Sequence, residues 1–333
     1  MPPSTRRELA LCTLRRVGFF DALAAQTGRE AAVESCSAIA HRETNTPRLE
    51  ELRYQYRTWN CDAYNHSQWS GTYAFDGIDI RSFRKESSYL WDLRDGNVPL
   101  TYAATYYYHR SSINNDLLQL CEEDRAFGVY ALSIDGSVVT RDRLDSVAEI
   151  GFLRRMLGWS SSYDGTILDI GSGYGRLAWR ISQCFPSSFV VCVDAVPESA
   201  FLCEFYLAHR GIASNGRMVP LPSIGDDLTV RKIDVAIAVN SLSECSLIAI
   251  RWWLALLADL KVPHLMLVPH AVFSGGQRLL STESDSSNRA DLLPVIRSYG
   301  YYKHRMFTKY EDSKIQLYGI SPTTYHLFSR ETP

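Results

Sequence analysis

The segment "TILDIGSGYGRLAWRI", residues 166–181, places an apolar run before a cluster of three glycines and an amphipathic stretch after it. The apolar run predicts a buried β-strand, and the amphipathic stretch predicts a helix. Glycines between a strand and a helix let the backbone approach a ligand closely, and the first turn of the helix offers free N–H groups. The segment therefore predicts a nucleotide-binding turn in an α/β fold.

Strand and helix patterns alternate through the rest of the second half of the chain. Strands are predicted at 166–170, 188–195, 216–222, 233–241 and 264–270, and helices at 175–185, 197–211 and 246–260. The strands are continuously apolar, which is typical of a parallel sheet covered by helices on both faces. Residues 301–320 and 323–331 are expected to add strands joined by turns, antiparallel at the sheet edge. We expect a doubly wound, Rossmann-like α/β sheet, mostly parallel, with an antiparallel C-terminal strand.

The first half of the chain has few strand signals. Helical patterns occur around residues 6–25 and 112–125, and a further helix is predicted at 145–159 with Asp145 or Ser146 as its cap. We expect residues 1–150 to form a mainly helical region that covers the site and contacts the substrate. Residues 151–333 should form the domain that carries the nucleotide-binding turn.

The composition is that of an ordinary globular protein and argues against some classes of function. The 333 residues carry a formal net charge of −2, which gives no overall field to attract nucleic acid, so no nucleic-acid partner is expected. We expect no membrane span, because no stretch approaches the roughly 20 apolar residues that one requires. Arginines interrupt the apolar N-terminal residues, which is unlike a secretory signal and favours a cytoplasmic protein. The 8 cysteines form no CxxC pair, which favours buried free thiols. The oligomeric state is not indicated.

The spacing of the glycines separates two kinds of nucleotide site. Gly171, Gly173 and Gly175 follow the pattern G-x-G-x-G, whereas a dinucleotide site has G-x-G-x-x-G, and Arg176 stands where its last glycine would fall. Asp169, at the end of the strand, would repel a pyrophosphate and attract an ammonium group. S-adenosylmethionine has an ammonium group and no phosphate. Asp194, at the end of the next strand, could accept hydrogen bonds from a ribose diol of either cofactor.

The run "ILDIGSGYG" followed by "VVCVDA" resembles the first two motifs of class I S-adenosylmethionine-dependent methyltransferases. The resemblance covers roughly the half of the chain after residue 150 and implies that the cofactor is S-adenosylmethionine. It implies that Asp169 orients the amino-acid end of the cofactor and that Asp194 binds the ribose. The cofactor-binding residues expected in this way are Asp169, Gly171, Ser172, Gly173, Gly175, Asp194, Ala195 and Asn240.

Two segments depart from the common pattern of that family. The third strand region lacks an obvious acid for the adenine, so Ser223 and Asp226 remain alternatives. The fourth strand ends in "NSLSE" and not in a "DPPY"-type motif, which argues against methylation of DNA or protein amides.

The acceptor is expected to be a hydroxyl group. The combination of "LDIGSGYGRLA" with "VNSLSE" is similar to the sugar O-methyltransferase group of bacterial natural-product and polysaccharide enzymes, which also carry a long helical N-terminal region. This similarity implies methylation of a sugar or of a saccharide-containing small molecule. The alternatives are a non-sugar natural-product hydroxyl and a non-catalytic scaffold that binds the cofactor.

Methyl transfer to a hydroxyl benefits from a positioned general base. His270 and Glu244 follow neighbouring predicted strands and are the first candidates. The structural alternatives are that Glu244 caps the next helix and that His270 binds a loop carbonyl. His109 is the next candidate, within an aromatic run at Tyr106–Arg110 that could form a lid over a sugar, although packing is the commoner role of such runs.

The sequence does not indicate whether a divalent metal such as Mg²⁺ is bound. Carboxylate oxygens and water are the ligands that Mg²⁺ prefers, and Asp226, Asp227, Glu244 and His270 could contribute. No spacing singles out any of them.

Overall fold

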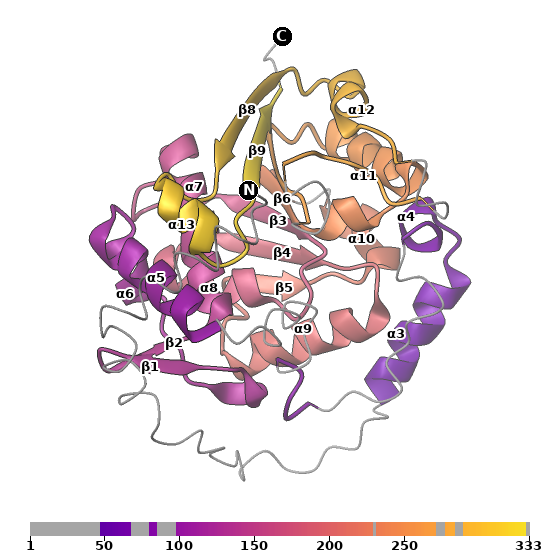
Figure 1. The fold of residues 1–333 in the computed structure, drawn as a ribbon. Helices are drawn as coiled ribbons and strands as arrows, with labels where there is room; N and C mark the ends of the chain where they lie inside the picture. Colours follow the sequence, from indigo (N-terminus) through magenta and orange to yellow (C-terminus); the bar gives the residue numbers. More distant parts are fainter. Residues whose placement is uncertain are drawn as a thin grey trace. The chain divides into compact units, whose positions relative to one another are not determined.

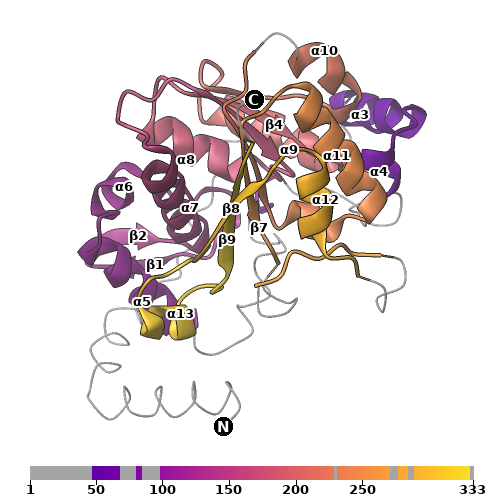
Figure 2. The ribbon, with the colours of Figure 1, turned by 90° about the horizontal axis from the view of Figure 1, so that it is seen from above.

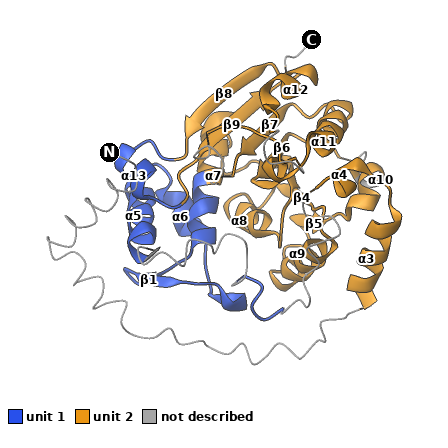
Figure 3. Cartoon of the chain, turned by 45° about the vertical axis from the view of Figure 1, so that its right-hand side comes forward, with its two compact units in different colours: residues 1–42, 79–148, 310–320 blue, residues 43–78, 149–309, 321–333 orange. Residues whose placement is uncertain are grey.

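The computed structural model describes residues 47–67, 80–84, 98–228, 231–270, 277–283 and 289–330. The helix expected at residues 6–25 lies outside these ranges. The chain forms two compact units, shown in different colours in Figure 3. Unit 1 comprises Met1–Arg42, Asp79–Ala148 and Tyr310–Ile320, and unit 2 comprises Glu43–Ile78, Glu149–Lys309 and Ser321–Pro333.

Unit 2 is built on a seven-stranded sheet with the order β5-β4-β3-β6-β7-β9-β8 (Figure 1). The strands are β3 (Thr166–Ile170), β4 (Phe189–Val193), β5 (Gly216–Met218), β6 (Val235–Val239), β7 (His264–Val268), β8 (Lys303–Thr308) and β9 (Thr324–Ser329). The pairs among β3 to β7 are parallel, whereas β9 is antiparallel to both β7 and β8. This arrangement confirms the expected fold class, a doubly wound and mostly parallel sheet with an antiparallel strand from the C-terminal end.

The chain winds in both directions from the central strand β3. The connection through α8 (Arg176–Cys184) leads from β3 to β4 on one side, and the one through α11 (Leu247–Asp259) leads from β6 to β7 on the other. Because such crossovers are right-handed, helices of opposite winding cover opposite faces of the sheet, as Figure 2 shows for α8 and α11. The other helices of unit 2 are α3 (Pro47–Thr58), α4 (Asp62–Asn65), α9 (Pro197–His209), α10 (Ile224–Leu228) and α12 (Leu292–Ser298).

The N-terminal segment with α3 and α4 belongs to unit 2, and this differs from the expected division near residue 150. Helix α3 lies along α9 and buries Leu49, Leu52 and Tyr56, which are spaced as one face of a helix. The short helix α4 contacts α11. Burial of this apolar face makes the segment part of the core of the sheet unit.

Helix α7 (Arg141–Leu157) starts in unit 1 and ends in unit 2. It begins before the expected caps Asp145 and Ser146, because the hydroxyl of Thr140 accepts a hydrogen bond from the backbone N–H of Arg143 at 3.1 Å. A threonine that satisfies an N–H of the first turn is a favourable N-cap.

Unit 1 is mainly helical in the part that the structure describes. It contains α5 (Val98–Ser111), α6 (Asn115–Leu120), a short hairpin of β1 (Leu132–Ile134) and β2 (Ser137–Val139), and α13 (Ser313–Tyr318). Helix α13 lies where the sequence predicts strands. The carboxylate of Asp312 accepts hydrogen bonds from the backbone N–H groups of Lys314 and Ile315, which favours a helix over a strand here.

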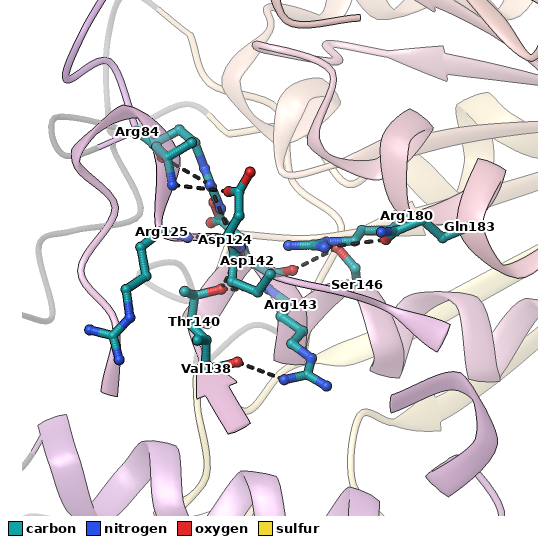
Figure 4. A network of polar contacts seen from close by, with 12 residues as sticks. Arg84, Asp124, Arg125, Val138, Thr140, Asp142, Arg143, Ser146, Arg180 and Gln183 are labelled. Carbon is teal, nitrogen blue, oxygen red and sulfur yellow. Dashed lines mark hydrogen bonds and ion pairs between the residues drawn. The ribbon is translucent and has the colours of Figure 1, made fainter. Parts of the chain in front are cut away.

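A buried ion-pair network holds unit 1 together. The guanidinium of Arg84 donates to Glu123 at 2.8 Å and to Asp142 at 3.2 Å, and all three side chains are almost completely buried. Figure 4 shows Arg84 and Asp142 in this network. Loss of Arg84 would leave two buried carboxylates without their positively charged partner, which is costly.

The described cysteines are free and buried, as expected: Cys61, Cys121, Cys184, Cys192, Cys203 and Cys245. Among the described helices, none combines the length and the apolar character needed to cross a membrane.

Candidate cofactor and catalytic site

The glycine turn connects β3 to α8 and is held by the end of β4. The backbone N–H groups of Gly171 and Ser172 both donate to the carbonyl of Val193, at 2.8 and 3.1 Å. Gly171, Gly173 and Gly175 all have positive φ angles, of 74°, 57° and 86°. This backbone conformation is open to glycine and strained for most other residues, which explains the spacing seen in the sequence.

The three glycines differ in what surrounds them. A Cβ atom at Gly171 would lie 2.2 Å from the Cβ of Ser241, and one at Gly175 would lie 3.0 Å from the Sγ of Cys203. A Cβ at Gly173 would meet no heavy atom within 4 Å. Gly171 and Gly175 therefore serve close packing, whereas Gly173 faces open space.

Asp194 follows β4 and ties the turn to the second strand. One carboxylate oxygen accepts a hydrogen bond from the backbone N–H of Gly173, and the other accepts one from Val196, both at 2.9 Å. Burial raises the pKa of Asp194 to about 6, and the N–H groups of Val196, Gly173 and Ala195 oppose that rise. A carboxylate has about four acceptor positions, so these contacts leave capacity for further donors.

Asp169 is buried near the end of β3, in register with Cys192 of β4 and Ile237 of β6. Burial raises the pKa of its carboxyl group to about 7; the charge of Arg176 lowers it, and Glu149 and Asp194 raise it further. Arg176 is itself bound by both carboxylate oxygens of Glu149, at 2.9 and 3.2 Å. This buried group thus contains three carboxylates and one guanidinium, an excess of negative charge that favours a cationic ligand.

The segment after β6 contacts the glycine turn directly. Ser241 donates a hydrogen bond from its hydroxyl to the carbonyl of Ile170, at 2.5 Å, and its Cβ fills the space beside Gly171. The preceding residue, Asn240, has a φ of 66°, which is unusual for a residue with a side chain. Such strain persists only where the surrounding structure imposes it, and it is concentrated at functional sites.

His270 and Glu244 lie at the same end of the sheet, as their positions after β7 and β6 predict. The backbone N–H of His270 donates to the hydroxyl of Ser243 at 3.2 Å, and Ser243 immediately precedes Glu244. The backbone N–H of Asn240 donates to the carbonyl of Val268 at 2.8 Å, so the two segments are joined at a second point. The side chains of His270 and Glu244 are half-buried.

Glu283 takes part in capping the helix that follows Glu244. The first N–H of α11, from Leu247, donates to the carboxylate of Glu283 at 2.9 Å. Glu283 also accepts a hydrogen bond from Ser281 at 2.7 Å.

His109 and the tyrosine run belong to unit 1 and are engaged within it. His109 is almost completely buried beside Tyr310, with ring centroids 6.2 Å apart. The hydroxyl of Tyr108 accepts a hydrogen bond from the backbone N–H of Glu311 at 3.2 Å. Arg110 forms an ion pair with Asp135. These contacts support the packing interpretation of the run, and the lid remains a prediction.

The remaining residues considered for contact with the adenine and for metal binding are Ser223, Asp226 and Asp227. Ser223 lies in a 3₁₀ turn, Leu221–Ser223, after the short strand β5, whereas the side chains of Asp226 and Asp227 lie outside the description. The described residues include no group of three or more His, Cys, Asp or Glu side chains placed to hold a metal ion.

Three residues with contacts at this end of the sheet were not predicted from the sequence: Tyr56, Ser241 and Glu283. Tyr56 belongs to α3, and its hydroxyl contacts the ends of both β4 and β5. The available signal was the spacing of Leu49, Leu52 and Tyr56, which marks a buried helix face but not the surface that it meets.

No protein-family model matches the chain, and no curated protein matches it. Among solved structures, the METTL16 MTase domain aligns with 86% of this chain and 93% of its own length, at 12% identity and a TM-score of 0.41. The mitomycin 7-O-methyltransferase MmcR aligns with 57% of this chain and 56% of its own, at 16% identity and a TM-score of 0.37. The TrmK of M. capricolum, in complex with S-adenosylhomocysteine, aligns with 50% of this chain and 62% of its own, at 14% identity and a TM-score of 0.31. These similarities are low, and the fold assignment rests on the strand order of the chain itself.

Proposed function

We propose that this chain is an S-adenosylmethionine-dependent methyltransferase that methylates a hydroxyl group of a sugar or of a saccharide-containing small molecule. The observation that carries the proposal is the G-x-G-x-G turn at the carboxyl end of β3, set between the buried carboxylates Asp169 and Asp194. Ligands of doubly wound sheets bind outside this end of the strands.

The residues of the turn fit this cofactor. The excess of buried carboxylates around Asp169 suits an ammonium group and opposes a pyrophosphate. Open space at Gly173 leaves room for a ligand against the backbone. Asp194 keeps acceptor capacity for the two hydroxyls of a ribose.

When bound, the cofactor supplies a methyl group on a positively charged sulfur. The chain must then position the acceptor oxygen and remove its proton, because a sugar hydroxyl is a weak nucleophile. We assign the acceptance of this proton to the imidazole of His270, because an imidazole is the side chain best suited to proton transfer near neutral pH. Glu244 would orient that ring or accept the proton itself.

The sugar acceptor is supported by the resemblance of two sequence segments and by the groups at the end of β6. Asn240 and Glu244 provide an amide and a carboxylate, which suit a molecule with several hydroxyls. Methylation of a phenol or of another natural-product hydroxyl would use the same end of the sheet.

Binding and transfer are tested separately. Calorimetry with S-adenosylhomocysteine should show saturable binding and none with NAD, and Asp194→Ala should weaken the binding about tenfold or more, since charge-assisted hydrogen bonds contribute roughly 1.5–3 kcal/mol. Saturable binding of NAD alone would overturn the cofactor assignment. A panel of glycosides, phenols and carboxylates with methyl-labelled cofactor then identifies the acceptor. Binding without transfer to any acceptor would favour the scaffold alternative.

A further inference from the structure

Helix α3 is fixed to the sheet unit by paired charges as well as by its apolar face. Arg48 donates two hydrogen bonds to the carboxylate of Glu204, at 2.9 and 2.6 Å. Arg53 donates to Glu198 at 2.7 Å, and Glu198 is almost completely buried. Because both acids lie on α9, they hold α3 at a defined position along that helix.

This position places the hydroxyl of Tyr56 between two strand ends. Tyr56 is fully buried, and its hydroxyl donates to the backbone carbonyl of Asp194 at 2.9 Å. The same hydroxyl accepts a hydrogen bond from the backbone N–H of Leu221 at 3.0 Å. Asp194 follows β4, and Leu221 follows β5, so one side chain spans the carboxyl ends of two adjacent strands.

The order of the strands indicates which part of the cofactor lies there. If Asp169 of β3 holds the ammonium group and Asp194 after β4 holds the ribose, the base would lie toward the next strand in the same direction. That strand is β5, because the sheet order is β5-β4-β3. The base would therefore lie near the segment that starts at Leu221.

We infer that Tyr56 is a positioning residue for cofactor binding: its hydroxyl fixes the distance between the Asp194 and Leu221 segments and so shapes the subsite for the nucleoside. The inference rests on the proposed function. Tyr56 does not touch the reacting atoms in this role, so it should affect cofactor affinity and leave the rate at saturation unchanged.

The test uses the full chain and the variant Tyr56→Phe, which keeps the ring and removes the hydroxyl. We expect the affinity for S-adenosylhomocysteine to fall about tenfold, because a buried carbonyl and a buried N–H both lose their partner. Adenosine, measured by competition, should lose affinity by the same factor, because it carries only the nucleoside. In turnover, KM for S-adenosylmethionine should rise while kcat stays within about twofold of the wild type.

Tyr301→Phe is the matched control. Tyr301 is also fully buried, and its hydroxyl donates to the carbonyl of Val262 at 2.9 Å, at the amino end of β7 and away from the cofactor end of the sheet. This variant loses one buried hydrogen bond where Tyr56→Phe loses two, so thermal denaturation should show a loss of stability no larger than that of Tyr56→Phe, whereas both affinities should stay unchanged.

The outcomes separate the inference from the proposed function. If the wild type does not bind S-adenosylhomocysteine, the proposed function fails. If the wild type binds and Tyr56→Phe binds equally tightly, the role of Tyr56 is refuted. Should Tyr56→Phe not fold, the double variant Arg48→Gln with Arg53→Gln loosens α3 from α9 instead, and unchanged affinities for both ligands would then refute the inference.

Discussion

At the scale of single residues, the site combines two buried carboxylates whose protonation controls both stability and binding. The pKa of Asp169 is raised to about 7, mainly by burial, against an ordinary value of about 3.8. Between about pH 4 and pH 7 the carboxyl group of Asp169 is therefore protonated in the folded state and ionised in the unfolded chain. Ionisation of Asp169 destabilises the folded state unless a cationic ligand is bound.

The first prediction follows from the upward direction of this pKa shift. As pH rises from about 4 to 7, the wild type should lose free energy of unfolding relative to Asp169→Asn, and the difference should level off above pH 7. Binding of S-adenosylhomocysteine should tighten over the upper part of the same window, because its ammonium group requires the carboxylate. Urea denaturation of both proteins at a series of pH values measures the difference; a difference independent of pH would contradict the raised pKa.

The second prediction concerns the base. His270→Ala should lower turnover by roughly 10²–10⁴-fold and leave the affinity for S-adenosylhomocysteine nearly unchanged. Glu244→Gln should cost less if Glu244 only orients the imidazole. The reverse order of effects would make Glu244 the base. Wild-type turnover in both variants would exclude both residues, which leaves His109 as the next candidate or methyl transfer that relies on alignment alone.

At the scale of elements, the turn between β3 and α8 is in contact with Ser241, which follows β6. The third prediction compares two glycines with similar φ angles, of 74° at Gly171 and 57° at Gly173. Both alanine variants carry the strain of a positive φ, about 1 kcal/mol. Gly171→Ala also collides with Ser241, at a distance of 2.2 Å, whereas Gly173→Ala meets no protein atom within 4 Å.

Gly171→Ala should therefore lower the melting temperature much more than Gly173→Ala. Gly173→Ala should instead weaken cofactor binding, because its methyl group occupies the open space where the ligand would lie. Thermal denaturation and calorimetry on the same preparations measure both effects. Equal melting temperatures would show that Ser241 moves aside at little cost.

At the scale of the whole molecule, the chain joins distant segments into each unit. Helix α3 is separated by more than a hundred residues from α9, yet it completes the core of the sheet unit. The fourth prediction tests that membership. Leu52 is completely buried in α3, so Leu52→Ala should lower the free energy of unfolding by about 2–5 kcal/mol, as expected for a filled core position.

The exposed residue Tyr54 on the same helix is the control for this variant. It has a relative exposure of 63%, and Tyr54→Ala should change the free energy of unfolding by about 0.5 kcal/mol or less. Guanidinium denaturation followed by circular dichroism measures both changes. A loss below about 1 kcal/mol for Leu52→Ala would show that α3 is dispensable for the core.

The strands around the site and the glycine turn can be predicted from the order of the amino acids. Largely apolar runs such as Thr166–Ile170, bounded by glycines, favour buried strands, and the spacing of Gly171, Gly173 and Gly175 favours a tight turn before the next helix. These features depend on residues that are neighbours in the chain, so periodicity and spacing reveal them. The tertiary structure decided what distant segments contribute. In the folded chain, Tyr56 lies across the ends of β4 and β5, and Glu283 accepts the hydrogen bond from the first N–H of α11. Separately, the local hydrogen bonds of Asp312 favour a helix at residues 313–318, where strands were expected. The first two contacts depend on partners far away in the chain, and the helix depends on two local hydrogen bonds. Hydrophobic periodicity indicates neither.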